Sequence, residues 1–463
     1  MASIPYLAIG PTAILSFIGL LYGQDKTIPT PTEDWKTATV EILIPAQNEE
    51  KNIVLSLSSI LEQSVKPWRI TLVDDGSTDG TSKLAKEYSK AYNFELNIIH
   101  NSKGKGKTVA LREMALNSEA DVVLVLDADT ILRSTNFIER LVFELYQGVG
   151  IACASGVVLP FMTEDRKRQL KVPSVMKFSE NFPFVKKEIH STKFNKIQQR
   201  ITDLYREELY LFLQKFIYHS EMVYFGTIIH PIGCAVAYRK KYLKKVFEQY
   251  FEMLGNRLSV AEDNFLGFAF LDYGYHNIQL QDIYALSQEP LLSELPKQML
   301  RWSSGFFQSC YYFNELIITP FKFPRVLTRW FKEKVSGHQK RIQNIRKIKE
   351  AYRESFGSEY TKKYGRPIGW YIFSSSIEKL SFPVVLFLMF YYKYWEGLII
   401  TICVDVLLFT SLTVILHKNR RIKNLFKCLL LTPIRYLALM FDIYVIGNFI
   451  KDLMFSKQKE WKI

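Results

Sequence analysis

The sequence contains few cysteines, and their spacing indicates neither a disulfide framework nor a zinc site. Five occur in 463 residues, none forms a Cys-x-x-Cys pair, and two lie in long apolar runs. Disulfide-rich domains and structural zinc sites both need paired or closely spaced cysteines. We therefore expect a reducing compartment and no zinc. The five are Cys153, Cys234, Cys310, Cys403 and Cys428.

Nucleic-acid-binding motifs, internal repeats and low-complexity tracts are also absent. The net charge of +14 could by itself indicate a nucleic-acid partner, but the basic residues concentrate at 321–366 and 417–427, beside hydrophobic segments. Such basic flanks are typical of cytoplasmic segments that face anionic lipid, so we expect no nucleic-acid partner. The segment GKGKT at 104–108 lacks the spacing of a P-loop.

Long apolar runs occur at the two ends of the chain. Residues 5–22 are uncharged and nearly long enough to cross a bilayer. No basic region precedes them and no cleavage site follows, so they predict an anchor rather than a signal peptide. The last apolar run contains Pro433, Arg435 and Asp442, and is either a bundle-facing helix or a broken hairpin. The C-terminal runs are 371–394, 396–416 and 428–454.

Between these ends, strand and helix patterns alternate. Such alternation predicts a parallel α/β sheet with right-handed crossovers, in which ligands bind at the carboxyl ends of the strands. The polar segment 161–221 has helical patterns but no role that the sequence assigns, and the domain resumes at 223–290. The expected strands are 39–46, 69–76, 95–101 and 120–130, and the expected helices are 52–63, 81–92, 107–118 and 135–146.

Two carboxylates, Asp127 and Asp129, follow the most apolar of these strands. Side chains at i and i+2 of an extended chain face the same way, so these two could share one hard cation. Mg²⁺ and Mn²⁺ prefer oxygen ligands and often combine one or two carboxylates with substrate phosphates. The alternative is an acidic cap for the helix at 135–146.

The segment Asp74-Asp75-Gly76-Ser77 ends another strand. It is either a turn with a helix cap or a turn whose carboxylate binds a nucleoside. Lys107 ends a run in which lysine and glycine alternate. That run is either a solvated loop or a cationic site for a diphosphate, which needs close backbone approach.

Two later motifs carry further candidates. Glu262 and Asp263 precede an apolar helix pattern, where acids either complement the helix dipole or supply a general base. Gln298 begins the segment Gln-Met-Leu-Arg-Trp. Arg301 could bind phosphate and Trp302 could face a sugar ring, although both residue types are also common at membrane interfaces.

The order of these motifs resembles that of the family-two, GT-A-fold glycosyltransferases. The resemblance is to the membrane-integrated branch that holds cellulose, chitin, hyaluronan and poly-N-acetylglucosamine synthases, and it covers roughly residues 40–310. Members of that branch run P-x-x-N-E, D-D-G-S, G-K, D-x-D, E-D and Q-x-x-R-W before C-terminal membrane helices. The matching segments are Pro45 to Glu49, Asp74 to Ser77, Gly106–Lys107, Asp127 to Asp129, Glu262–Asp263 and Gln298 to Trp302.

The resemblance implies a GT-A, Rossmann-like nucleotide-sugar-binding domain with N-terminal and C-terminal transmembrane helices. It implies a UDP-sugar donor, Mg²⁺ or Mn²⁺ on the diphosphate, and Asp263 as the catalytic base. The implied catalytic residues are Asp263, Glu262 and Arg301. The implied donor site comprises Pro45, Gln47, Glu49, one or both of Asp74 and Asp75, Lys107 and Asp127. The implied metal ligands are Asp129 and Asp127, and the implied acceptor site is Gly233, Cys234, Gln298 and Trp302.

We therefore expect an inverting, metal-dependent glycosyltransferase that passes several times through the cell membrane, with a cytoplasmic catalytic domain. The implied acceptor is a growing β-linked glycan, and the alternative is single transfer to a lipid. Three features depart from the family. Gln47 stands where many members have an aromatic residue, only one N-terminal span is evident, and Glu460 to Lys462 resembles a gating-loop motif only faintly. The expected parts are an anchor and linker (1–38), the catalytic domain (39–310), basic membrane-interface helices (311–368) and a transmembrane region (369–463).

Overall fold

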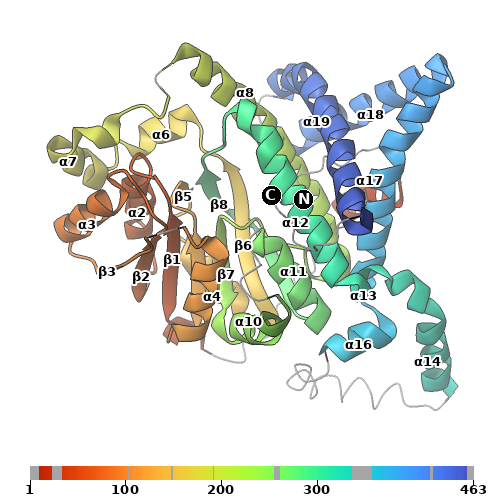
Figure 1. The fold of residues 1–463 in the computed structure, drawn as a ribbon, viewed down its shortest axis with the longest axis horizontal. Helices are drawn as coiled ribbons and strands as arrows, with labels where there is room; N and C mark the ends of the chain where they lie inside the picture. Colours follow the sequence, from red (N-terminus) through yellow and green to blue (C-terminus); the bar gives the residue numbers. More distant parts are fainter. Residues whose placement is uncertain are drawn as a thin grey trace.

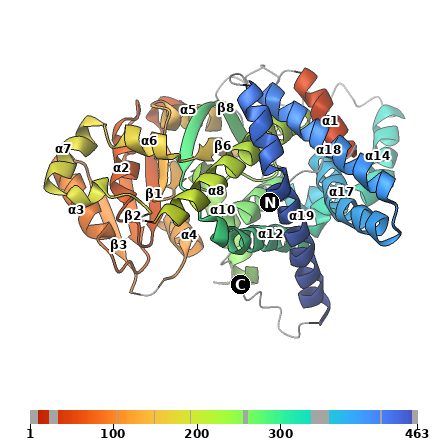
Figure 2. The ribbon, with the colours of Figure 1, turned by 90° about the horizontal axis from the view of Figure 1, so that it is seen from above.

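The computed structural model places an α/β domain beside a group of long C-terminal helices. Figure 1 shows the strands β1, β2 and β3 on one side of the molecule and the helices α17, α18 and α19 on the other. Figure 2, seen from above, shows the same separation, with α1 lying among the C-terminal helices. The structure describes residues 10–22, 34–102, 104–147, 150–190, 192–254, 261–335, 357–417 and 421–455.

In the part of the chain that the structure describes, one mixed sheet of eight strands has the order β3-β2-β1-β4-β7-β6-β8-β5. The first four strands of the chain pair in parallel, as predicted. The other half of the sheet adds antiparallel pairs, β4 with β7, β7 with β6 and β8 with β5, which the alternating pattern did not predict. The strands are β1 (Val40–Ala46), β2 (Arg69–Asp74), β3 (Leu96–His100), β4 (Val122–Leu126), β5 (Thr130–Leu132), β6 (Ile151–Pro160), β7 (Ala235–Arg239) and β8 (His276–Ser287).

The strand order reverses at β1, because the chain moves from β1 to β2 and β3 and then returns to place β4 on the other side of β1. Parallel α/β sheets bind ligands at such a switch point, outside the carboxyl ends of the strands. Ala46 at the end of β1 pairs with Asp74 at the end of β2. Glu49, Asp75 and Asp127, which follow β1, β2 and β4, therefore belong to the same edge of the sheet.

Helices cover both faces of the sheet, as the continuous apolar runs in the strands predict. Successive residues of β1 enter different clusters, with Ile42 and Ile44 in one and Leu43 in the other. Leu84 of α3 joins the first cluster and Leu111 of α4 the second. The first four helices that follow strands are α2 (Ile53–Leu61), α3 (Thr81–Tyr92), α4 (Lys107–Asn117) and α5 (Phe137–Leu145), close to the predicted ranges.

The polar segment that the sequence left unassigned is a helical connector. Its longest helix, α8, packs against β6 on one side and against α18 and α19 on the other. After α8, the side chain of Gln214 bonds both backbone groups of Val158 in β6, at 2.8 and 2.7 Å. The segment therefore joins the sheet to the C-terminal helices. It comprises α6 (Thr163–Gln169), α7 (Pro173–Asn181), α8 (Lys193–Phe212), η3 (Leu213–Ile217) and α9 (Tyr218–Phe225).

Within the described residues, three helices are long and apolar enough to cross a membrane, namely α17, α18 and α19. The end of α18 and the first part of α19 lie against α8, since His417 and Lys427 both contact Glu208, at 3.2 and 2.6 Å. The helices after β7 are α10 (Lys240–Leu254), α11 (Glu262–Tyr273), α12 (Leu295–Tyr312), α13 (Asn314–Ile317), α14 (Phe323–Val335), α16 (Gly357–Tyr364), α17 (Pro367–Tyr391), α18 (Trp395–Leu416) and α19 (Arg421–Phe455).

Of the two alternatives for the last apolar run, the structure forms the unbroken helix. Pro433 lies inside α19 without ending it. Arg435 points into the helix group, where it pairs with the buried Asp405 of α18, which also accepts a hydrogen bond from Tyr436 at 2.8 Å. A buried ion pair between two helices satisfies the charges that a lipid-facing position would leave exposed. A hairpin broken around Pro433 to Arg435 is therefore wrong.

The N-terminal helix α1 (Pro11–Leu21) is shorter than a membrane span. Eleven residues rise about 16 Å, against about 30 Å of hydrocarbon. Its polar residues bond to other helices, with Thr12 N–H donating to Glu378 at 2.9 Å and Ser16 meeting Ser220 at 3.1 Å. The described part of the predicted anchor therefore packs on α9 and α17. Residues 5–9 and 460–462 lie outside the described residues.

Candidate active site

Lys107 joins motifs that lie far apart in the sequence. It is the first residue of α4, after Gly106, whose φ of +87° favours glycine. Its Nζ lies 2.7 Å from Asp127 Oδ1 and 2.9 Å from Glu262 Oε1, and donates to the carbonyl oxygen of Gly233 at 3.0 Å. Burial alone would lower the pKa of Lys107, but the two carboxylates raise it well above its ordinary value. Lys107 therefore stays charged and fixes both acids.

Asp263 lies beside Glu262 in the first turn of α11 but is not held by an ion pair among the described residues. Its Oδ2 accepts the backbone N–H of Gly233 at 3.2 Å. A Cβ at Gly233 would lie 2.9 Å from that oxygen, so any larger residue there would displace the Asp263 carboxylate. Burial, and then the charge of Glu262, raise the pKa of Asp263 to about 6. Cys234 follows Gly233 in the chain, and its carbonyl oxygen accepts the backbone N–H of Asp127 at 2.9 Å. This hydrogen bond connects the segment Gly233–Cys234 to the D-x-D motif.

Asp75 organises the glycine-rich loop that precedes α4. Its carboxylate accepts the backbone N–H groups of Lys105 and Gly106, at 2.7 and 2.8 Å. Its carbonyl oxygen accepts the side-chain amide of the exposed Gln47 at 3.1 Å. Pro45, two residues earlier, is half-buried in β1. Three of the residues predicted to hold the nucleotide therefore lie at the ends of β1 and β2, namely Pro45, Gln47 and Asp75.

Asp74, by contrast, is buried and turned toward the start of α3. Its carboxylate accepts the backbone N–H of Ser77 at 2.8 Å and the hydroxyl of Ser82, and it lies 3.4 Å from His100. Burial alone would raise the pKa of Asp74, but these hydrogen bonds lower it below its ordinary value. Asp74 therefore holds the turn before α3 without capping that helix, while the Asp75 carboxylate binds the loop before α4.

Asp129 is a half-buried carboxylate without a cationic partner among the described residues. Burial, and then the charges of Glu49 and Asp127, raise the pKa of Asp129 well above its ordinary value. Burial and the nearby Asp127 likewise raise the pKa of Glu49. Of the three acids Glu49, Asp127 and Asp129, only Asp127 forms an ion pair with Lys107 among the described residues. This excess of negative charge fits a bound cation. The described residues hold no group of three or more His, Cys, Asp or Glu that could bind a metal, so further ligands would come from phosphate oxygens and water.

The predicted acceptor residues of α12 are held by an arginine that the sequence did not single out. Arg206 of α8 is almost fully buried and donates to Gln298 Oε1 at 2.6 Å. Its guanidinium carbon lies 4.6 Å from the centre of the Trp302 ring. Its Nε lies 3.4 Å from the carboxylate of the buried Glu289. Arg206 and Glu289 therefore form the support for Gln298 and Trp302.

Glu289 also connects this support to the D-x-D motif. The residue before it, Gln288, donates its backbone N–H to the carbonyl oxygen of Asp129 at 3.3 Å. The charge of Glu289 is close enough to contribute to the raised pKa of Asp129. Arg301 is exposed on α12 and forms no ion pair with a described residue. An exposed, unpaired arginine next to a supported tryptophan is available to an anionic ligand.

We expect Arg206→Met to reduce turnover at least tenfold while nucleotide affinity stays near that of the parent, since Gln298 and Trp302 lose their support. Loss of one partner from a buried ion pair costs about 3–5 kcal/mol of stability, so unfolding must be measured alongside activity. The double variant Arg206→Met/Glu289→Gln removes the unpaired acid. Arg200→Gln, an exposed ion-pair residue of the same helix, is the control. Parent-like turnover in a folded Arg206→Met protein would contradict this role.

Comparison with known proteins gives a family for the first part of the chain. Residues 41–247 match the model of glycosyl transferase family 2, so the chain contains a family 2 domain. The match includes the motifs from Pro45 to Asp129 and ends before Glu262, Asp263 and α12. With the observed sheet, it identifies the domain as a GT-A α/β domain, as predicted from the sequence.

Individual relatives match over shorter segments. A human dolichyl-phosphate beta-glucosyltransferase is 33% identical over 116 residues, which are 23% of this chain and 36% of that protein. The 4,4'-diaponeurosporenoate glycosyltransferase of Staphylococcus aureus strain N315 is 29% identical over 125 residues, 27% of this chain and 32% of that protein. The alignments thus span about a third of these relatives. The solved mannosyltransferase PcManGT of Pyrobaculum calidifontis, in complex with GDP-Man and Mn²⁺, aligns with a TM-score of 0.45 at 14% identity over 96% of this chain and 93% of its own.

Proposed function

We propose that the protein transfers a sugar, with inversion, from a UDP-sugar to an acceptor hydroxyl at a membrane surface. The observation that carries this proposal is the cluster around Lys107. Its amine holds Asp127 of the D-x-D motif and Glu262 of the E-D motif in one place. A donor site at the D-x-D motif would thereby lie next to Asp263.

The chemistry follows from the charges of this cluster. A general base works best when its pKa lies near the working pH, and Asp263 meets this condition with a pKa of about 6. Asp263 would take the proton of the acceptor hydroxyl as its oxygen attacks the anomeric carbon, and the bond to the nucleotide diphosphate would break. Glu262, fixed by Lys107, would keep α11 in place rather than exchange protons. Arg301 would stabilise the charge on the departing diphosphate.

A divalent cation, Mg²⁺ or Mn²⁺, would be held by Asp129 with Asp127 and would neutralise part of the diphosphate charge. The support for it is the uncompensated Asp129 carboxylate. Asp75 and Gln47 would lie along the uridine, with Pro45 and Glu49 behind them. Gly233, Cys234, Gln298 and Trp302 would border the acceptor.

Two acceptors follow from this chemistry. The Q-x-x-R-W motif followed by apolar helices favours extension of a β-linked polysaccharide. A lipid acceptor is favoured by two of the relatives, which are named for the lipids dolichyl phosphate and 4,4'-diaponeurosporenoate. Incubation of the purified chain in lipid nanodiscs with radiolabelled UDP-sugars and membrane extract tests the function. Label should enter a larger product by a β-linkage. Label that stays wholly in the nucleotide-sugar with every donor would contradict the function.

Contacts at the two ends of α19 support a cytoplasmic location for both of these ends and for the catalytic domain. The first end is held near Glu208 of α8, and the other meets α12 where the Phe449 and Phe307 rings lie 4.9 Å apart. With basic residues at 417–427, the positive-inside rule places this surface in the cytoplasm. The helices α17 and α18 would then form a hairpin that crosses the membrane and returns, while α19 lies along the domain.

A cysteine at Lys451, near the end of α19, should react with a membrane-impermeant maleimide only after cell lysis. A cysteine at Tyr392, in the turn between α17 and α18, should react on intact cells and serves as the control. The parent chain gives the background of the five native cysteines. Strong labelling of Lys451→Cys before lysis would place the end of α19 outside the cell and remove the proposed arrangement.

A further inference from the structure

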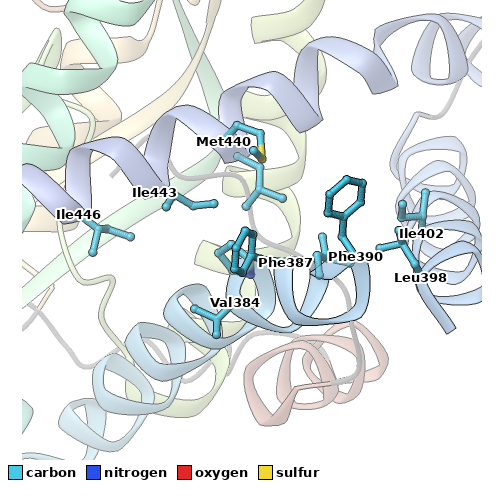
Figure 3. A pocket seen from close by; sticks show the side chains of 11 residues that line it. Val384, Phe387, Phe390, Leu398, Ile402, Met440, Ile443 and Ile446 are labelled. Carbon is cyan, nitrogen blue, oxygen red and sulfur yellow. The ribbon is translucent and has the colours of Figure 1, made fainter. Parts of the chain in front are cut away.

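An apolar cavity of about 700 Å³ lies between α17, α18 and α19 and is partly open to the surroundings, since lining residues such as Phe387 and Met440 are exposed. Figure 3 shows Val384, Phe387 and Phe390 of α17 facing Met440 and Ile443 of α19 across it, with α18 closing one end. None of the side chains that line it carries an oxygen or nitrogen atom. Small-molecule sites in proteins usually occupy about 300–1,000 Å³, so the volume suffices for a ligand.

One buried cluster of packed side chains borders both the cavity and Trp302 of the candidate acceptor site. Leu439 lines the cavity and belongs to the same buried cluster as Met299 of α12. Leu386, which also lines the cavity, and Trp302 both pack against this cluster. The cavity thus lies behind the helix that presents Gln298 and Trp302 to the acceptor.

The chemistry of the wall distinguishes between the two acceptors. A glycan in this cavity would lose the hydrogen bonds of its hydroxyl groups to water and find no partner among the lining residues. Each such loss costs about 1–3 kcal/mol. A hydrocarbon chain loses nothing and gains about 0.8 kcal/mol for each buried methylene. Two of the helices around the cavity, α17 and α18, form the proposed membrane hairpin, so hydrocarbon chains are the molecules that surround it on that side.

We propose that this cavity binds the hydrocarbon chain of a lipid acceptor, whose hydroxyl head group reaches Asp263 past Trp302. This proposal rests on the proposed function and commits that function to a lipid acceptor rather than a polysaccharide. In the step itself, the head-group oxygen bonds to the anomeric carbon, the bond from that carbon to the diphosphate breaks, and Asp263 receives the proton. If the acceptor were instead a growing glycan, that glycan would lie outside the helix group.

The test measures KM for a series of straight-chain alcohols, from about four to about sixteen carbons, with the full chain in nanodiscs. Because each buried methylene favours binding, KM should fall at least tenfold along the series. Ile443→Trp and Val384→Trp fill the cavity and should raise KM for the longest alcohol at least tenfold. KM for the shortest alcohol and for the UDP-sugar should stay unchanged. Leu437→Trp, an exposed position on α19 outside the cavity, is the control.

Two outcomes would overturn the proposal. The cavity-filling variants could keep the chain-length dependence of the parent, which would show that the chain lies in bulk lipid. Alternatively, the label could collect only in a lipid-free polymer. Transfer to no acceptor at all would instead remove the proposed function as well. A second measurement does not depend on the variants, since a sixteen-carbon alcohol with a terminal diazirine should crosslink to cavity residues of α17 or α19. Crosslinks confined to positions outside the cavity, such as Leu437, would overturn the proposal.

Discussion

Replacing Asp263 with asparagine should reduce sugar transfer by about 10²–10⁴-fold, the usual contribution of a general base. Asparagine keeps the size of the side chain and can still accept the N–H of Gly233, but it cannot take a proton from the acceptor. Nucleotide binding should stay nearly intact, because Lys107 and Asp127 do not depend on Asp263 for their contact. Initial rates with radiolabelled donor, and calorimetric binding of UDP, measure the two quantities separately.

Asp272→Asn is the matched control for this variant. Asp272 lies on the same helix, and burial raises its pKa to about 6 as well, but it faces Tyr250 rather than the site. It should keep near-parental transfer. The parent rate should rise with pH through about 6 as Asp263 loses its proton, and Asp272→Asn should keep that profile. Transfer by Asp263→Asn near the parent rate would remove Asp263 from the role of base.

The parallel half of the fold was predictable because each strand there carries its own local signal. Apolar runs bounded by turn residues fixed β1, β2, β3 and β4, and periodicity placed α3 at the predicted range of 81–92. The antiparallel strands were harder to predict from the sequence. β7 and β8 each pair with at least one strand more than a hundred residues away, and short apolar segments do not say which neighbour they take.

The residues of the candidate site likewise include some that the sequence could place and some that it could not. Residues that follow strands, such as Asp75 and Asp127, could be placed because strand ends locate them. Arg206 could not be placed in the site, because the sequence does not distinguish a buried arginine from an exposed one until its partner is known. Gln199 and Asp203 precede it at spacings that put all three on one helical face. That polar face was visible in the sequence, but only the fold shows Glu289 and Trp302 opposite it.

Metal dependence should be visible both in activity and in stability. Asp129→Ala should reduce transfer at least about 100-fold, and excess chelator should reduce the parent to a similar level, because the diphosphate charge is then uncompensated. A ligand that binds only the folded state stabilises it by mass action. Mn²⁺ with UDP should therefore raise the melting temperature of the parent but not that of Asp129→Ala. This readout needs no turnover.

The raised pKa of Asp129 leads to a second expected result for Asp129→Ala, on its melting temperature without metal. Burial beside Glu49 and Asp127 makes the ionised carboxylate unfavourable in the metal-free protein, so its removal should not destabilise the fold. In chelator, Asp129→Ala should therefore melt no lower than the parent, whereas a carboxylate that served only the fold would lower the melting temperature. Asp282→Asn, an exposed ion-pair residue of β8, controls for a general loss of charge. Full turnover of the parent in excess chelator would rule out the metal, and Asp129 would then need another role.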